Sequence, residues 1–222
     1  VGSGTAQLGA QAGHTVVLVD QHESALEGSA AALAKVATRL VEKGKWSAAD
    51  SERIQSAIDR TTALDSLAAC DWVIEAIVED LGVKQSLFQS LETIVASDAV
   101  LATNTSSLSV TAIAGKLQHP ERFMGLHFFN PAPLMALVEV VPALQTDAAH
   151  VDRAKAMMDA WGKSPVVTKD TPGFIVNRVA RPFYGEALRI LEERLASRET
   201  VDAAMRNAGF RMGPFELMDL IG

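Results

Sequence analysis

Short apolar runs rich in β-branched residues alternate with longer helical patterns over the first two-thirds of this chain. Such runs are typical of strands buried on both faces of a sheet, and three of them are Thr15–Val19, Trp72–Ile74 and Ala99–Ala102. Helical patterns lie at about 24–43, 50–59 and 81–97. Strand, helix and strand repeated in this way predict an α/β fold with a mostly parallel sheet covered by helices.

The later part of the chain changes character. Further strands are predicted at 123–128, 137–141 and 164–168, with a helix at about 147–161. After the Pro-Gly pair in Asp170–Gly173, the patterns at 174–198 and 199–208 are helical, with no further strand. We therefore predict two domains, with residues 1–169 forming the sheet domain and residues 170–222 a smaller all-helical domain.

Composition excludes several classes of function. The net charge of −7 offers no basic face for nucleic acid. No apolar run approaches the roughly 20 residues that cross a bilayer, and no signal peptide opens the chain, so we expect no membrane partner. The single cysteine, Cys70, excludes an internal disulfide and suits a reducing compartment, which favours a cytoplasmic location.

One histidine and one glutamate stand out because they lie in apolar surroundings. His127 opens the run His127-Phe-Phe-Asn130-Pro131, and Glu139 follows twelve residues later within Leu137–Val141. Burying ionisable groups is costly unless they pair, and an imidazole held by a carboxylate is a general base at neutral pH. Each residue alone also fits a structural role, as a packed core histidine or a strand-edge carboxylate.

A nucleotide site is indicated at the start of the chain. Gly2-Ser-Gly4 resembles the beginning of a phosphate-binding glycine turn, although Gln7 stands where a third glycine is expected and the run also fits an ordinary turn. Asp20 ends the strand at 15–19, where a carboxylate can accept both ribose hydroxyls of NAD. Gln21 follows it in place of an arginine that would favour NADP.

The glycine turn also raises a geometric problem. A helix running back beside a five-residue strand needs about 11 residues, whereas Thr5 to Ala12 gives eight. We therefore hypothesise that about four to six residues are missing between Thr5 and Ala6, on the same helix arithmetic. The apolar ending Leu217–Gly222 likewise suggests that the helical domain is truncated.

Polar residues follow the second predicted strand. Glu79 closes the run Glu75–Glu79, and Lys84 begins the next helix. Because polar groups at the carboxyl ends of parallel strands face the ligand crevice, Glu79 and Lys84 are candidates for contacts with ribose or nicotinamide. An ordinary exposed ion pair would fit them equally well.

Four motifs together resemble the 3-hydroxyacyl-CoA dehydrogenases. They are Asn104-Thr-Ser-Ser-Leu108, His127-Phe-Phe-Asn-Pro131, Leu137-Val-Glu139 and Thr171-Pro-Gly-Phe-Ile-Val-Asn-Arg178. They occur in the family's order, and the similarity covers essentially the whole chain. The resemblance implies a Rossmann-type domain followed by a helical domain that carries a homodimer contact.

The resemblance also implies an activity, which is NAD-dependent, reversible oxidation of a 3-hydroxyacyl-CoA thioester to the 3-oxoacyl-CoA, with no metal. His127 matches the catalytic base and Glu139 its carboxylate partner, while Ser106 and Asn177 match substrate contacts near the reacting oxygen. The matches on the cofactor side are Gly2, Gly4, Asp20, Glu79, Lys84, Ser106 and Asn130, and Lys43 matches a contact to CoA.

Two departures and two alternatives accompany this interpretation. Family members carry a methionine and two more glycines between the positions of Thr5 and Ala6, and they continue beyond Gly222. One alternative is a dehydrogenase of free hydroxy or sugar acids on the same fold. The other is a non-catalytic NAD-binding protein that keeps the scaffold.

Overall fold

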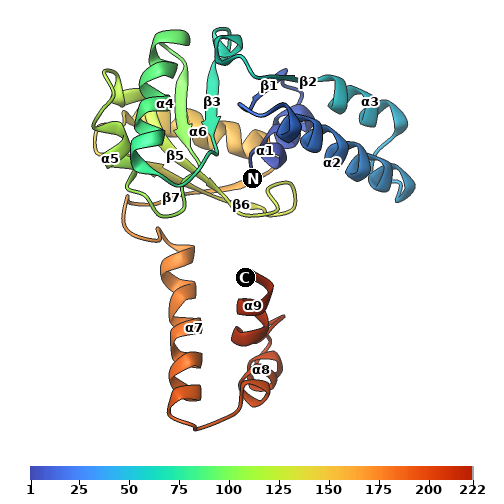
Figure 1. The fold of residues 1–222 in the computed structure, drawn as a ribbon, viewed down its shortest axis with the longest axis vertical. Helices are drawn as coiled ribbons and strands as arrows, with labels where there is room; N and C mark the ends of the chain where they lie inside the picture. Colours follow the sequence, from blue (N-terminus) through green and yellow to red (C-terminus); the bar gives the residue numbers. More distant parts are fainter. Residues whose placement is uncertain (222) are drawn as a thin grey trace. The chain divides into compact units, whose positions relative to one another are not determined.

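A computed structural model describes residues 1–221 and divides the chain into two compact units, Val1–Pro172 and Gly173–Gly222 (Figure 1). The division falls three residues later than the predicted boundary. The reason is Asp170, whose carboxylate accepts hydrogen bonds from Ser109 Oγ at 2.8 Å, Val110 N at 3.1 Å and Thr111 N at 2.8 Å. These bonds tie the end of the first unit to the start of helix α5 (Val110–Ala114).

The first unit alternates strands and helices as the sequence predicts. In order, its elements are α1 (Gly2–Gln11), β1 (Val16–Val19), α2 (Glu23–Glu42), α3 (Ala48–Ser56), β2 (Ile58–Thr61), η1 (Leu64–Leu67), β3 (Trp72–Glu75), α4 (Leu81–Ile94), β4 (Val100–Thr103), α5 (Val110–Ala114), η2 (Pro120–Arg122), β5 (Phe123–Phe128), β6 (Leu137–Pro142), α6 (Ala148–Ala160) and β7 (Ser164–Val167). Strands β3 to β7 form one sheet in that order, and β1 pairs with β2. Only the pairing of β5 with β6 is antiparallel among the described residues, so the mostly parallel α/β fold is confirmed.

Strand β2 is an element that the sequence did not indicate. The predicted helix at 50–59 ends at Ser56, and residues 58–61 instead pair in parallel with β1, Ile58 opposite Val16. Asp59 and Arg60 interrupt the apolar pattern in this strand, which is why no apolar run marked it. The true start of the helix is fixed by Ser47, whose side chain accepts a hydrogen bond from the backbone N–H of Asp50.

The hypothesis that residues are missing between Thr5 and Ala6 stays a prediction. Helix α1 begins at Gly2 and runs without a break through Thr5 and Ala6, and the Thr5 N–H donates to Val1 O at 3.0 Å. The hypothesis placed the glycines in a turn before the helix, whereas they belong to its first turn. The helix therefore has ten residues, and it runs beside a strand of only four.

A glycine sets the distance between this helix and its strand. A Cβ on Gly9 would lie 3.1 Å from Cγ2 of Val16 in β1, which is tighter than ordinary van der Waals contact. Glycine at this position therefore allows α1 to approach β1 closely.

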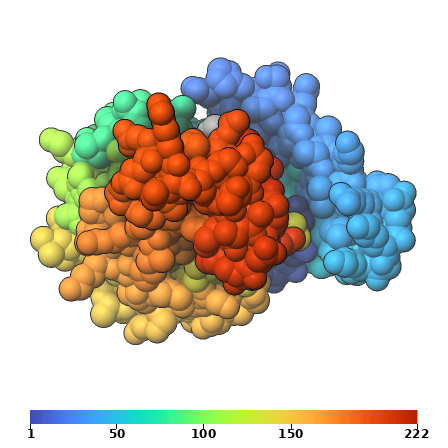
Figure 2. All heavy atoms as spheres, turned by 90° about the horizontal axis from the view of Figure 1, so that it is seen from below, coloured from blue at the N-terminus to red at the C-terminus, as the bar shows by residue number. Residues whose placement is uncertain are grey.

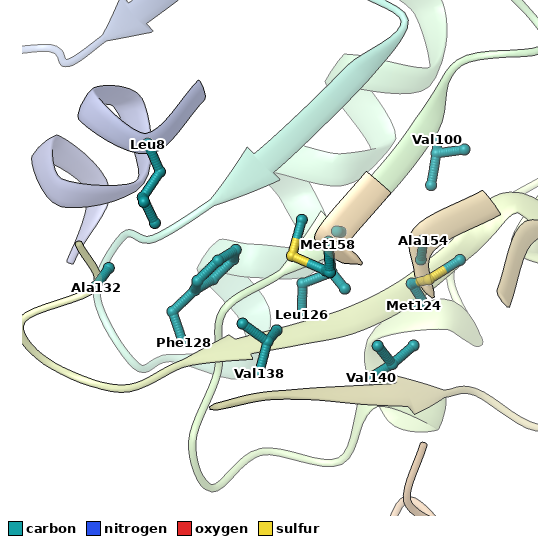
Figure 3. Close-up of a cluster of buried hydrophobic side chains, with 11 residues drawn as sticks. Leu8, Val100, Met124, Leu126, Phe128, Ala132, Val138, Val140, Ala154 and Met158 are labelled. Atoms are coloured by element: carbon teal, nitrogen blue, oxygen red, sulfur yellow. The ribbon is translucent and has the colours of Figure 1, made fainter. Parts of the chain in front are cut away.

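The main hydrophobic core lies on one face of the five-stranded sheet (Figure 3). Its strand residues come from alternating positions, with Leu126 and Phe128 on β5 and Val138 and Val140 on β6. Helices α1 and α6 cover this face, and α4 and α5 cover the other (Figure 1), where Phe88 packs edge-on against Phe123. Because side chains alternate along a strand, the odd-numbered residues of β5 and β6 point away from this core.

The second unit consists of α7 (Val176–Glu192), α8 (Arg198–Asn207) and α9 (Pro214–Ile221), coloured orange to red in Figures 1 and 2. The predicted helix at 174–198 is shorter than expected because the chain turns at Arg194, with φ at 56°, and Ser197 caps α8. Ala187, Val201 and Phe215 form the core of this unit. Helix α9 was not predicted separately.

In the part of the chain that the structure describes, no helix is both long enough and apolar enough to cross a bilayer. Residues 1–221 also contain no group of three or more His, Cys, Asp or Glu side chains that could hold a metal ion.

Gly213 should be essential to the helical unit. A Cβ at this position would overlap the backbone of Asp202, whose carboxylate accepts hydrogen bonds from Phe215 N at 2.9 Å and Glu216 N at 3.2 Å. We expect Gly213→Ala to lower the free energy of unfolding by about 1–3 kcal/mol, the usual cost of overpacking. Chemical denaturation followed by circular dichroism measures the change.

Gly185→Ala is the matched control, because Gly185 lies in the same unit within α7 and a Cβ there meets nothing within 4 Å. This variant should be more stable than the parent by about 0.5–1 kcal/mol, as expected for Gly→Ala in a helix. Equal stability of the two variants would contradict the close contact inferred at Gly213.

Candidate functional site

The centre of the candidate site is a histidine and a glutamate that face each other across two strands. His127 on β5 and Glu139 on β6 are direct partners in the antiparallel register, and His127 Nδ1 lies 2.6 Å from Glu139 Oε2. Both residues are buried, with 5% and 1% of their surfaces exposed. They occupy odd-numbered positions and therefore lie on the sheet face opposite the main core. The contact expected from the sequence is present.

This arrangement determines what the imidazole can do. A hydrogen bond from Nδ1 to the carboxylate fixes the tautomer, so that Nε2 of the neutral ring is the proton acceptor. The ring of Phe129 lies 4.6 Å from the imidazole, centroid to centroid, and contributes an apolar wall. A carboxylate so placed also stabilises the imidazolium that forms when the ring takes a proton.

Ser106 follows β4, and its backbone is held by Glu79. One carboxylate oxygen of Glu79 accepts hydrogen bonds from Ser106 N at 3.0 Å, Ser107 N at 3.2 Å, Ser107 Oγ at 2.9 Å and Thr105 Oγ1. Burial raises the pKa of Glu79, but the hydrogen bonds from Thr105, Ser107 and Ser106 and the positive charge of Lys84 outweigh it and bring the pKa to about 2. Glu79 is therefore ionised at neutral pH.

Lys84 lies behind Glu79. Its ammonium is 2.6 Å from Oε1 of Glu75 and 3.3 Å from Oε2 of Glu79, and only 1% of the side chain is exposed. Thr103 Oγ1 donates to the other oxygen of Glu75 at 2.7 Å. Glu75 is not among the site residues predicted from the sequence, although a charged residue ending an apolar strand is a signal that could have pointed to it.

The structure places the candidate nucleotide residues at the start of α1 and the end of β1. Gly2 and Gly4 lie in the first turn of α1, which no side chain caps and which contains no acidic residue. Unpaired N–H groups at a helix N-terminus suit a phosphate. Asp20 directly follows β1, and its Oδ1 accepts a hydrogen bond from His22 N at 2.9 Å. These residues therefore fit the phosphates and ribose of a dinucleotide.

Asn130 belongs to a loop that packs against the same turn of α1. Its peptide bond to Pro131 is cis, and a Cβ on Gly4 would lie 3.2 Å from Cδ of Pro133. Lys163 holds this loop, because its buried ammonium donates to Ala132 O at 2.7 Å and to Met135 O at 2.9 Å. Burial lowers the pKa of Lys163. Sequence reasoning missed Lys163, since nothing near it in the chain marks its role.

One predicted site residue, Lys43, lies at the far end of a long helix, and another, Asn177, belongs to the second unit. Lys43 is the C-cap of α2, a helix of 20 residues, whereas Asp20 lies just before the start of that helix. An α-helix of that length spans about 30 Å. Asn177 lies in the first turn of α7, in the other unit, and its part in the site stays a prediction.

Comparison with known proteins gives a consistent answer over the whole chain. Residues 1–171 match the family model described as "3-hydroxyacyl-CoA dehydrogenase, NAD binding domain", and residues 173–222 match "3-hydroxyacyl-CoA dehydrogenase, C-terminal domain". The two ranges meet where the structure divides into its two units.

Individual relatives agree with the family models. The chain is 48% identical to 3-hydroxyadipyl-CoA dehydrogenase of Escherichia coli K12 over 223 residues, which cover 100% of this chain and 47% of the relative. It is 41% identical to 3-hydroxybutyryl-CoA dehydrogenase of Clostridioides difficile, again over 223 residues, covering 100% of this chain and 79% of the relative. It therefore spans about half the length of the first relative.

A solved structure with a TM-score of 0.97 is described as 3-hydroxybutyryl-CoA dehydrogenase from Escherichia coli K12. It is 48% identical in sequence, and the match covers 99% of this chain and 47% of that one. By sequence and by fold, the chain belongs to the 3-hydroxyacyl-CoA dehydrogenase family, and its first unit is that family's NAD-binding domain.

Proposed function

We propose that this chain catalyses the NAD-dependent, reversible oxidation of an (S)-3-hydroxyacyl-CoA thioester to the 3-oxoacyl-CoA, with His127 as general base and Glu139 as its partner. The observation that supports this most directly is the buried contact of 2.6 Å between His127 Nδ1 and Glu139 Oε2. Family membership supplies the reaction class, and this pair supplies a group able to take the proton.

The chemistry required of the protein is proton removal and positioning. When bound, NAD supplies the acceptor for the hydride that leaves C3 of the substrate. Nε2 of His127 takes the proton of the 3-hydroxyl, and the electron pair of that O–H bond forms the new carbonyl. Glu139 keeps the ring oriented and balances the charge that develops on it. In the reverse direction, the imidazolium returns the proton.

The remaining predicted site residues are proposed to bind and orient the substrate and the cofactor. Ser106 and Asn177 would donate hydrogen bonds to the substrate oxygen as charge develops on it. Gly2 and Gly4 would meet the phosphates, Asp20 the ribose, and Glu79, Lys84 and Asn130 would act on the nicotinamide side. Lys43, at the end of α2, would meet CoA.

Substrate choice can be tested with a panel of thioesters. The relatives named above are described as acting on 3-hydroxyadipyl-CoA and 3-hydroxybutyryl-CoA. We propose a short or ω-carboxylated acyl chain for this protein as well. The assay would follow oxidation of NADH, and separately of NADPH, with acetoacetyl-CoA, longer 3-oxoacyl-CoA thioesters and 3-oxoadipyl-CoA. Equal rates with the free acids would favour a free-acid dehydrogenase, and NADH binding without turnover of any thioester would favour a non-catalytic protein.

We also propose a cytoplasmic homodimer that associates through the helical unit. Large apolar side chains are exposed on and after α7, among them Val179, Leu188 and Leu195, and they are available to a second copy. Size-exclusion chromatography with light scattering would measure the mass in solution, and cell fractionation would measure the location. A monomer at micromolar concentration would exclude the dimer.

His127→Gln should lower kcat by about 10²–10⁴-fold, the usual contribution of a general base. Affinity for NADH should change little, because the substitution removes the proton acceptor and leaves the α1 turn intact. Stopped-flow measurement of the chemical step and titration of NADH fluorescence test the two parts.

The matched control is His119→Gln, which makes the same change at an exposed histidine just before β5, at the end away from His127. This variant should have the kcat and the NADH affinity of the parent protein. A loss below about tenfold for His127→Gln would count against the general-base assignment, which is worth at least 10².

Asp20→Ala should weaken binding of NADH at least tenfold, an estimate for loss of a charged hydrogen bond, and should leave thioester affinity nearly unchanged. The reason is that a carboxylate at the end of β1 can accept both ribose hydroxyls. Asp59→Ala, at an exposed position on the neighbouring strand β2, is the control. Equal weakening of cofactor and thioester binding by Asp20→Ala would argue against the ribose role.

A further inference from the structure

We propose that Glu75 is a positioning residue for the proposed reaction, acting through Lys84 and Glu79 on the turn that carries Ser106. This inference rests on the proposed function, because it takes Ser106 to be a substrate contact. Glu75 itself would touch neither substrate nor cofactor.

Glu75 joins the ends of two strands to the first helical turn that follows. It is the last residue of β3, and its carboxylate accepts hydrogen bonds from Lys84 Nζ at 2.6 Å, Ile77 N at 2.6 Å and Thr103 Oγ1 at 2.7 Å. Thr103 ends β4, and Lys84 lies in the first turn of α4. A carboxylate with three donors in the interior fixes all three segments, since leaving any of these groups unpaired there is costly.

Lys84 is held between carboxylates. Besides Glu75 and Glu79, its ammonium lies 3.5 Å from the carbonyl oxygen of Ile77. With 1% of the side chain exposed, its three N–H groups are directed at partners within the protein. Lys84 can therefore act on a bound ligand only through Glu79 as long as these contacts persist.

The charges of Glu75, Lys84 and Glu79 are arranged asymmetrically between the interior and the surface. Two carboxylates flank one ammonium, which leaves one net negative charge. Glu75 is buried with 1% of its side chain exposed, whereas 37% of the Glu79 side chain is exposed. The negative charge thus reaches the surface at Glu79, and Glu75 serves to keep Lys84 in place behind it.

Glu79 in turn positions the Ser106 turn. Its carboxylate accepts the backbone N–H groups of Ser106 and Ser107, so the conformation of this turn depends on where Glu79 is held. Asn104, two residues before Ser106, is fixed at the other side, because its Oδ1 accepts a hydrogen bond from Phe128 N at 2.9 Å. Phe128 directly follows His127. Continuous contacts therefore lead from Glu75 to the turn beside the general base.

Glu75→Gln tests the proposal because it preserves the shape and removes the charge. A glutamine oxygen can still accept from Ile77 or Thr103, but it cannot balance Lys84, which would then be drawn towards Glu79. We expect kcat with acetoacetyl-CoA to fall at least tenfold. Glu92→Gln is the control, since Glu92 also ties backbone N–H groups of a loop, Gln118 and His119, to α4.

A double-mutant cycle with Ser106→Ala separates positioning from general destabilisation. If Glu75 acts through Ser106, Glu75→Gln should cost less than threefold in kcat when Ser106 is already alanine. Full additivity of the two effects, or a kcat for Glu75→Gln within twofold of Glu92→Gln, would overturn the proposal. Should Glu75→Gln fold poorly, Glu75→Gln/Lys84→Met removes the unbalanced ammonium as well, and it should stay at least tenfold slower than the parent.

Hydrogen exchange distinguishes failure of this inference from failure of the proposed function. Exchange of the Ser106 and Ser107 amides should accelerate at least tenfold in Glu75→Gln and not in Glu92→Gln. This readout does not require turnover. An inactive parent protein would refute the proposed function, and unchanged exchange in Glu75→Gln would refute the positioning role of Glu75 whether or not the parent is active.

Discussion

The antiparallel register of β5 and β6 is the constraint on which the site depends. It places His127 directly opposite Glu139, and it does so because neighbouring residues of the same strands are committed to the core on the other face. A shift by one residue would turn Phe128 towards the site and His127 into the core. The burial of Leu126 and Phe128 therefore stabilises the fold and also fixes the position of the imidazole.

Three ionisable side chains that are buried near one edge of the five-stranded sheet, Glu139, Glu75 and Lys163, have polar partners. The Glu139 carboxylate has an imidazole, Glu75 has an ammonium and a hydroxyl, and the Lys163 ammonium has two carbonyl oxygens. Unpaired, each would be costly, so such groups persist only where the surroundings are fixed. Their concentration along the strand ends and the following loops distinguishes this edge of the sheet from the apolar core.

The sequence predicts correctly those elements that have a local periodic pattern of apolar residues. The apolar runs located β1, β3, β4, β5, β6 and β7, and the motif around His127 located its contact with Glu139. Strand β2 was not predicted because Asp59 and Arg60 interrupt its apolar pattern. Its strand conformation comes from pairing with β1. The roles of Glu75 and Lys163 were not predicted either, because their partners, such as Thr103 and Ala132, are remote in sequence. Tertiary contacts decide such roles, and single-sequence patterns do not contain them.

The proposed ribose site at the end of β1 gives a physical reason why NAD would suit this chain better than NADP. A hydrogen bond from His22 N to one oxygen of Asp20 restrains the carboxylate, which therefore cannot easily turn away from a ligand at the strand end. A 2′-phosphate at that place would meet a fixed negative charge, followed in the chain by Gln21 and not by a basic residue. Like charges a few ångströms apart repel, whereas two ribose hydroxyls can donate to the same carboxylate. In the proposed ribose role of Asp20, the restraint that shapes the turn would also select the cofactor.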